Sequence, residues 1–182
     1  MPPFVNQRWP WTWKLWCSEP IAITSHCTSW PVVAWKTGVL PTNARPSMDE
    51  SIAGGMYCAL SILGRNQHKP DKEFVVIFAP MGQFQTIDGR AFVGNTPVFH
   101  SMVADLVQWD VMAMGSEHHT FHVHGHRWLT PGGISRDTQT VGPAESFRFR
   151  WREQDPGTWL YHCHVEDHMM KGMIGLYRVR RR

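Results

Sequence analysis

The stretch HCHVEDHMMKGM, residues 162–173, decides both the fold and the chemistry expected of this chain. It places one thiol, Cys163, between two imidazoles, and continues with His168 and Met173. Two histidines, a cysteine and a weakly bound methionine form the ligand set of a blue copper site. Of the histidines in this stretch, only His168 follows the thiol in line with the thioether. The second histidine ligand must therefore come from elsewhere in the chain.

A second histidine cluster, HTFHVHGH at residues 119–126, can supply the missing ligand. In an extended strand, successive side chains point to opposite faces. His122 and His124 therefore share one face, and His119, three residues before His122, falls on the other.

The same alternation applies to a strand over residues 158–165, where Cys163 points one way and its two flanking histidines point the other. Pairing the faces of the two strands predicts two metal sites. The first is formed by His119, Cys163, His168 and Met173, and the second by His122, His124, His162 and His164. Because the thiol is covalently continuous with both flanking histidines, an electron has a through-bond path between the sites.

The spacings H-x-x-H-x-H and H-C-H-x-x-x-H-x-x-x-x-M resemble the two C-terminal copper motifs of multicopper oxidases, the laccase group. The flanking sequence is most similar to two-domain, small-laccase-like members, and the resemblance runs from about Met48 to the C-terminus. It is carried outside the motifs by residues 94–97, 105–109, 142–147 and 156–161.

The resemblance implies a role for each candidate ligand. The first site is expected to hold type 1 copper, with Cys163, His162 and His164 as the electron path. In a trinuclear cluster, His122 is expected to bind type 2 copper, and the type 3 ligands are expected to be His124, His162 and His164. The implied reaction is one-electron oxidation of phenol-like substrates, coupled to reduction of oxygen to water.

Zinc is the main rival metal, but structural zinc sites usually pair cysteines at Cys-x₂₋₄-Cys spacing or histidines at His-x₃₋₅-His spacing. This chain offers one thiol in the motifs and too many histidines for one zinc, and a thioether favours copper. His118 and His126 fit no ligand position and are expected to contact ligands or face solvent. Glu166 and Asp167 are interpreted as a solvated turn, with proton relay as the alternative.

Composition places few limits on partners. A hydrophobic content of 42% and a charged content of 18% are typical of a soluble globular protein, and a net charge of +3 favours no nucleic-acid partner. No apolar run reaches the roughly 20 residues of a membrane span. No secretion signal is recognisable, although the family resemblance implies an extracellular or periplasmic location.

The sequence predicts an all-β protein, a Greek-key β-sandwich of the cupredoxin type, formed by residues 65–182. Residues 47–64 resemble the last strand of a preceding cupredoxin domain, and residues 1–46, rich in tryptophan, match no element of the family and stay unassigned. The strands of the main domain are predicted at residues 73–79, 86–92 around an Asp88-Gly89 hairpin turn, 105–114, 119–128, 145–152, 159–165 and 173–179.

A complete trinuclear cluster needs further His-x-His pairs from a first domain, and no such pair precedes His122. We therefore expect the chain to be truncated relative to its family, and either to form a homo-oligomer, a trimer by family resemblance, or to depend on a first cupredoxin domain. Three hypotheses stay open: a laccase-like oxidase, a mononuclear blue-copper electron carrier, and a copper-binding domain without oxidase activity.

Overall fold

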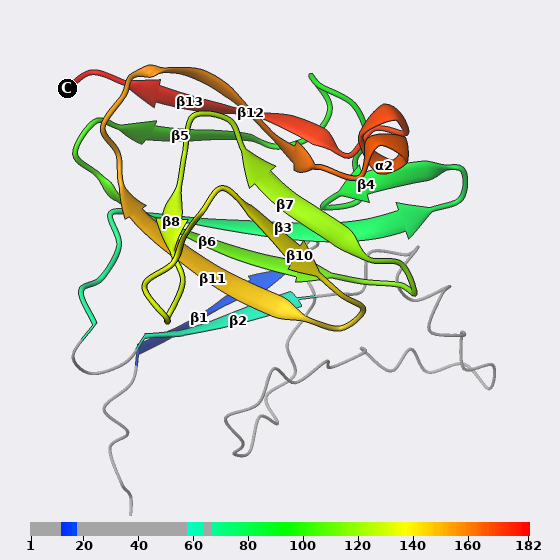
Figure 1. Ribbon diagram of the computed structural model, residues 1–182, viewed down its shortest axis with the longest axis horizontal. Helices are drawn as coiled ribbons and strands as arrows, with labels where there is room; N and C mark the ends of the chain where they lie inside the picture. Colours follow the sequence, from blue (N-terminus) through cyan, green and yellow to red (C-terminus); the bar gives the residue numbers. More distant parts are fainter. Residues whose placement is uncertain (1–11, 18–57, 64–66) are drawn as a thin grey trace, which may run out of the picture.

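The computed structural model describes residues 12–17, 58–63 and 67–182 (Figure 1). Within these residues the chain forms β-strands and one short helix, α2 (Glu166–Met170). No helix in this described part is long and apolar enough to cross a membrane.

Five strands form the sheet that carries both histidine clusters. Strands β7 and β12 are hydrogen-bonded neighbours near its middle, so the two metal motifs lie side by side. The order across this sheet is β10 (Thr138–Val141), β7 (His119–Val123), β12 (Gly157–Cys163), β13 (Ile174–Arg180) and β5 (Val98–Met102).

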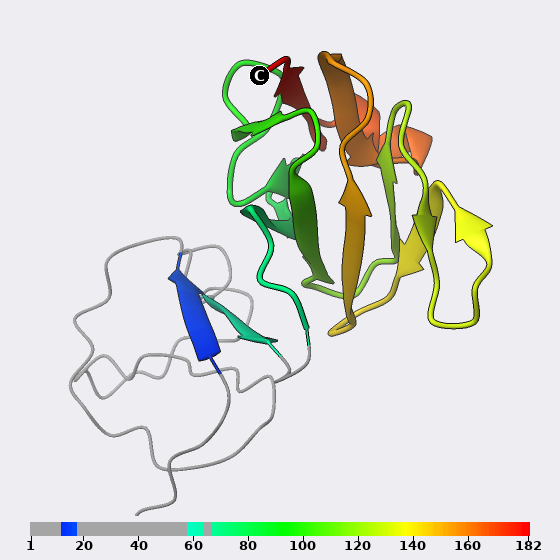
Figure 2. The same ribbon diagram turned by 90° about the vertical axis from the view of Figure 1, so that its left-hand side faces the viewer.

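Four strands form the second sheet, in the order β11 (Ser146–Arg152), β6 (Leu106–Ala113), β3 (Lys72–Met81) and β4 (Phe84–Ile87). The pairs β13–β5 and β3–β6 are parallel, and the other pairs in the two sheets are antiparallel. Parallel neighbours require long crossover connections, here between the two layers (Figures 1 and 2). This is the predicted all-β Greek-key sandwich, which the structure confirms.

The core lies between the two sheets and is strongly aromatic. Trp109 on β6 is fully buried. Its ring lies 5.6 Å from that of Phe121 on β7, 5.5 Å from that of Tyr161 on β12 and 5.1 Å from that of Tyr177 on β13, measured between ring centroids. Because interiors pack at near-crystalline density, these contacts give the metal-bearing strands a rigid base.

Side chains along β11 alternate between the core and solvent. Phe147, Phe149 and Trp151 are buried or half-buried, whereas Arg148 and Arg152 are exposed. A strand with one face on the core is expected to show this pattern.

Two predicted strands differ from the structure. Asp88 and Gly89 do form a tight turn with positive φ angles of 51° and 74°, but only one bridge, Ile87 to Arg90, follows it. Strand β4 instead pairs with β3. The strand predicted over residues 119–128 ends at Val123, because Gly125 turns the chain with φ of 71°.

Two small sheets complete the described chain. Strands β8 (Trp128–Leu129) and β9 (Ser135–Arg136) form a short hairpin. Strands β1 (Thr12–Cys17) and β2 (Cys58–Leu63) pair antiparallel, so part of the unassigned tryptophan-rich segment pairs with the predicted domain remnant. The rest of both segments, apart from these strands, lies outside the described residues.

Candidate metal centre

Pairing between β7 and β12 sets the geometry of both metal sites. The two strands are antiparallel, with Phe121 opposite Cys163 and His122 opposite His162. Directly opposed residues in such a pair share a face of the sheet. The thiol therefore faces the core with Phe121, while the two opposed histidines face away from it.

The first predicted site comes together inside the core. The Cys163 Sγ atom lies 3.6 Å from His168 Nδ1 and 3.9 Å from His119 Nδ1. All three residues are buried, and their candidate ligand atoms lie within 4.8 Å of one another. Sulfur and nitrogen atoms that each lie about 2.0–2.3 Å from one ion are separated by roughly such distances. The donor set and its spacing thus fit a single soft metal ion.

The protonation chemistry of the first site also suits a cation. Burial lowers the pKa of His119 to about 4, so its imidazole is neutral and can act as a ligand. Burial raises the pKa of the Cys163 thiol. A bound cation reverses that preference and favours the thiolate, and the Thr120 amide donates to the same sulfur at 3.2 Å.

Met173 is fully buried and is tied to the first site through its main chain. The Cys163 amide donates to the Met173 carbonyl at 3.1 Å, and the Met173 amide donates to the His168 carbonyl at 3.1 Å. Helix α2 carries His168 between these two points, so the loop from Cys163 to Met173 closes on itself around the site.

Glu117 is a site residue that the sequence analysis missed. Its carboxylate lies 3.3 Å from His168 Nε2, on the side of the imidazole away from the thiol. The same carboxylate accepts a hydrogen bond from Gln85 Nε2 at 2.6 Å, and the Glu117 side chain is about half exposed, at 48%. In the sequence, its role was indicated only by an acidic residue two positions before the candidate ligand His119.

The second predicted site comes together on the opposite face. The candidate ligand atoms of His122, His124 and His162 lie within 4.8 Å of one another, and the Nε2 atoms of His124 and His162 are 3.1 Å apart. The His164 ring lies 5.2 Å from that of His122. Unlike the first group, this one opens to solvent, because His124 and His164 are exposed.

Hydrogen bonds outside the second group orient two of its rings. His122 Nδ1 lies 2.7 Å from the Asp137 carbonyl, and His162 Nδ1 lies 2.9 Å from the Cys163 carbonyl. Since a carbonyl can only accept, both Nδ1 atoms donate, which leaves the ring's metal-binding lone pair on Nε2 in the neutral form. Metal-binding histidines are typically oriented in this way. Burial lowers the pKa of His162, which keeps this ring in its neutral form.

The neighbouring histidines differ from each other. His118 is exposed, whereas His126 is buried, lies 2.9 Å from the carboxylate of Glu153 and contacts the His124 carbonyl at 2.7 Å. Of the two expectations, solvent exposure holds for His118 and contact with a candidate ligand holds for His126. Glu166 and Asp167 are exposed in the first turn of α2, where Asp167 pairs with Lys171 at 2.7 Å.

Comparison with known proteins identifies the class. The family model described as "Multicopper oxidase" matches residues 65–182, and the chain belongs to this family. Its metal is therefore copper, which the donor sets above fit.

Curated relatives share this segment at moderate identity. Ceruloplasmin of Rattus norvegicus is 38% identical over 116 residues, which cover 62% of this chain and 10% of that protein. A probable nitrite reductase-hydroxylamine oxidoreductase fusion protein of Kuenenia stuttgartiensis is 31% identical over 153 residues, covering 72% of this chain and 18% of the relative. The chain thus spans less than a fifth of either relative.

Solved structures agree on the fold. A multicopper oxidase structure aligns with a TM-score of 0.61 at 18% identity, covering 72% of this chain and 52% of that one. Fet3p, described as a multicopper oxidase that functions in iron import, aligns with a TM-score of 0.57 at 19% identity, covering 79% of this chain and 38% of that one. At such identities the likeness establishes the cupredoxin fold alone.

Proposed function

We propose that this chain provides the type 1 copper domain of a laccase-like oxidase, which oxidises phenol-like molecules one electron at a time and reduces oxygen to water. The observation that carries the proposal is the position of Cys163. Its side chain lies in the buried group, while His162 and His164, bonded to it through the main chain, lie in the open group.

Copper, when bound, supplies the one-electron chemistry. The residues of this chain hold and connect the sites. His119, Cys163 and His168 would hold the first ion in a buried place that excludes water, and the buried Met173 would supply a weak fourth ligand. The Nε2 atom of His168 lies beside Glu117, which is half exposed. We therefore propose the Nε2 side of the His168 ring as the point where a reductant gives up its electron.

The open group requires a partner. His122, His124, His162 and His164 offer four imidazoles, with His122 proposed as the type 2 ligand and the other three as type 3 ligands. The exposure of His124 and His164 supports a facing domain that supplies the remaining ligands. We propose a first cupredoxin domain in the same assembly, in a trimer as in two-domain laccases, and an extracellular or periplasmic location.

Ferrous ion is a second candidate reductant. One curated relative carries the name Ferroxidase HEPHL1, in Mus musculus, and is 30% identical over 116 residues. In this chain, the half-exposed carboxylate of Glu117 beside His168 Nε2 offers a hard oxygen ligand at the proposed electron entry point.

The test uses copper-loaded chain with and without a first-domain partner that carries His-x-His pairs. Copper is counted per subunit, and oxygen uptake is measured with a phenol and with ferrous ion. Oxygen uptake in the assembled form supports an oxidase, and Glu117→Gln should slow iron oxidation more than phenol oxidation if iron is the substrate. A blue protein that consumes no oxygen in any assembly would instead be an electron carrier.

A further inference from the structure

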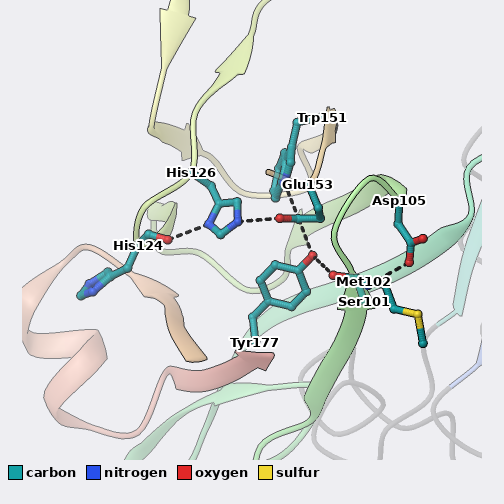
Figure 3. Close-up of polar contacts among 8 residues, drawn as sticks. All are labelled: Ser101, Met102, Asp105, His124, His126, Trp151, Glu153 and Tyr177. Atoms are coloured by element: carbon teal, nitrogen blue, oxygen red, sulfur yellow. Dashed lines mark hydrogen bonds and ion pairs between the residues drawn. The ribbon is translucent and has the colours of Figure 1, made fainter. Parts of the chain in front are cut away.

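Glu153 is a fully buried carboxylate outside both metal groups. It directly follows β11, and its side chain has no solvent exposure. Three hydrogen-bonding groups surround it: His126 Nε2 at 2.9 Å, Trp151 Nε1 at 2.6 Å and the Tyr177 hydroxyl (Figure 3). Burying a charge without such partners costs several kcal/mol, so this arrangement is a built site and not a chance contact.

The main chain of Glu153 is fixed as firmly as its side chain. Its amide donates to the Asp105 carbonyl at 2.9 Å, and its carbonyl accepts from the Ala104 amide at 2.9 Å. Tyr177 is held in turn by Ser101, with 2.6 Å between the two hydroxyl oxygens. Glu153 is therefore an anchor attached to the sandwich at several points.

His126 connects this anchor to the open histidine group. Its Nε2 meets Glu153, and its Nδ1 lies 2.7 Å from the carbonyl oxygen of His124, two residues earlier (Figure 3). Because a carbonyl can only accept, Nδ1 must donate to it. The His126 ring thus bridges the anchor and the main chain of a proposed copper ligand.

The turn that carries His124 needs such support. Strand β7 ends at Val123, so beyond it the main chain of His124 keeps one bond to β12, from its amide to the Leu160 carbonyl at 2.9 Å. Gly125 follows with positive φ. Packing of Trp159 against the His126 ring, with centroids 5.5 Å apart, and the contact of the same ring with Glu153 both hold this turn.

We propose that Glu153 is a positioning residue for the open copper site, and that it acts through His126 to fix the His124 ligand. The inference rests on the proposed function, because it assumes that His124 binds copper. Removing a group that hydrogen-bonds directly to a metal ligand changes metal affinity by about 10–100-fold, and Glu153 lies one residue further out, so its removal should cost up to about tenfold. The first site, held by Cys163 on the other face, does not depend on this anchor.

The test is a copper titration of the full chain against a competing chelator, with the blue absorption band and the non-blue Cu(II) resonance recorded separately. We expect Glu153→Gln to weaken copper binding at the non-blue site by up to about tenfold and to leave the blue band unchanged. Tyr177→Phe is the control, since it removes a donor from the same carboxylate but keeps the bond from His126. Its loss of non-blue affinity should be smaller.

A double-mutant cycle tests the route through His126. If the anchor acts through that ring, Glu153→Gln should add no further loss of affinity to a His126→Leu chain. Equal non-blue affinity in the parent chain and in Glu153→Gln would overturn the inference and leave the proposed function intact. A parent chain that binds only the blue copper would overturn the open site itself, and the role of Glu153 with it.

Discussion

His162 and Cys163 are consecutive residues of β12 whose side chains reach opposite faces of one sheet. The Cys163 sulfur lies 3.6 Å from His168 Nδ1 in the buried core, while His162 Nε2 lies 3.1 Å from His124 Nε2 in the open group. One peptide unit thus separates the two proposed metal sites, and the first predictions concern this junction.

Replacing Cys163 with serine should abolish the intense visible absorption of the copper-loaded chain. That absorption arises from charge transfer between thiolate sulfur and copper, and a hydroxyl is a harder and weaker ligand. Visible spectra after copper loading provide the measurement. Cys58→Ser, on β2, serves as the control and should stay blue. A fully coloured Cys163→Ser protein would contradict the assignment.

Met173→Leu should keep the copper and raise its reduction potential. A thioether is a weak axial donor that stabilises Cu(II), so its removal favours Cu(I). Leucine is close in volume to methionine, and the exchange should cost less than about 1.5 kcal/mol of stability. Potentiometric titration of the blue band measures the change. Complete loss of copper with the fold retained would mean that Met173 is a principal ligand.

The copper-loaded chain alone should oxidise phenols with oxygen poorly or not at all. Its open group holds four histidines, and copper bound by so few imidazoles should exchange readily. Oxygen uptake and copper content per subunit are the measurements. Turnover with four coppers per subunit would show that residues outside the two motifs complete the cluster.

Gly125→Ala should destabilise the fold more than Gly133→Ala. Both glycines have positive φ, 71° and 76°, which costs an alanine roughly 1–2 kcal/mol. At Gly133 the new methyl group meets nothing within 4 Å, whereas at Gly125 it would lie 2.6 Å from the Trp159 ring. This overlap should add about 1–3 kcal/mol. The unfolding free energies of both variants, measured in denaturant, isolate the cost of the contact with Trp159. Equal losses of stability would contradict the prediction.

The contribution of Asp88 to stability should fall as pH rises from about 4 to 7, opposite in sign to that of His119, whose lowered pKa adds stability over the same range. Burial raises the pKa of this carboxyl from 3.8 to about 7, against a hydrogen bond from the Ile77 amide that lowers it. A group with a raised folded-state pKa binds its proton more tightly when folded, so losing that proton destabilises the fold. Asp88→Asn keeps an acceptor for Ile77 and tolerates the positive φ.

Unfolding free energies of the parent chain and Asp88→Asn, measured across this pH range, test the assignment. The variant should lose part of the pH dependence and be the more stable of the two above pH 7. A parallel pair of curves would mean that Asp88 does not titrate in this window.

The sequence predicted the fold and the grouping of candidate ligands because both follow from period-two alternation. The faces assigned to His119, His122 and Cys163 need only a strand, and the structure brings these residues together in two groups as expected. Their assignment to individual coppers stays a prediction.

What the sequence could not predict depends on contacts between distant residues. Glu153 reaches His126 across 27 positions, and Glu117 reaches Gln85 across 32, with no spacing to indicate either. The strand at Thr12–Cys17 depends on its pairing with β2, and single-strand alternation does not reveal that partner. The hairpin expected around Asp88-Gly89 ends after one bridge, because the chain turns at Phe92, which has a positive φ of 71°.

The alternation along Gly157–Cys163 makes this strand sensitive to length in an unusual way. Inserting or deleting one residue before Cys163, with the pairing to β13 kept, would turn the thiol out to solvent and bring a histidine into the core. A change of two residues would preserve the faces. Variation in the length of this strand is therefore tolerable only in even steps, a constraint that acts on insertions and deletions and that no single substitution would reveal.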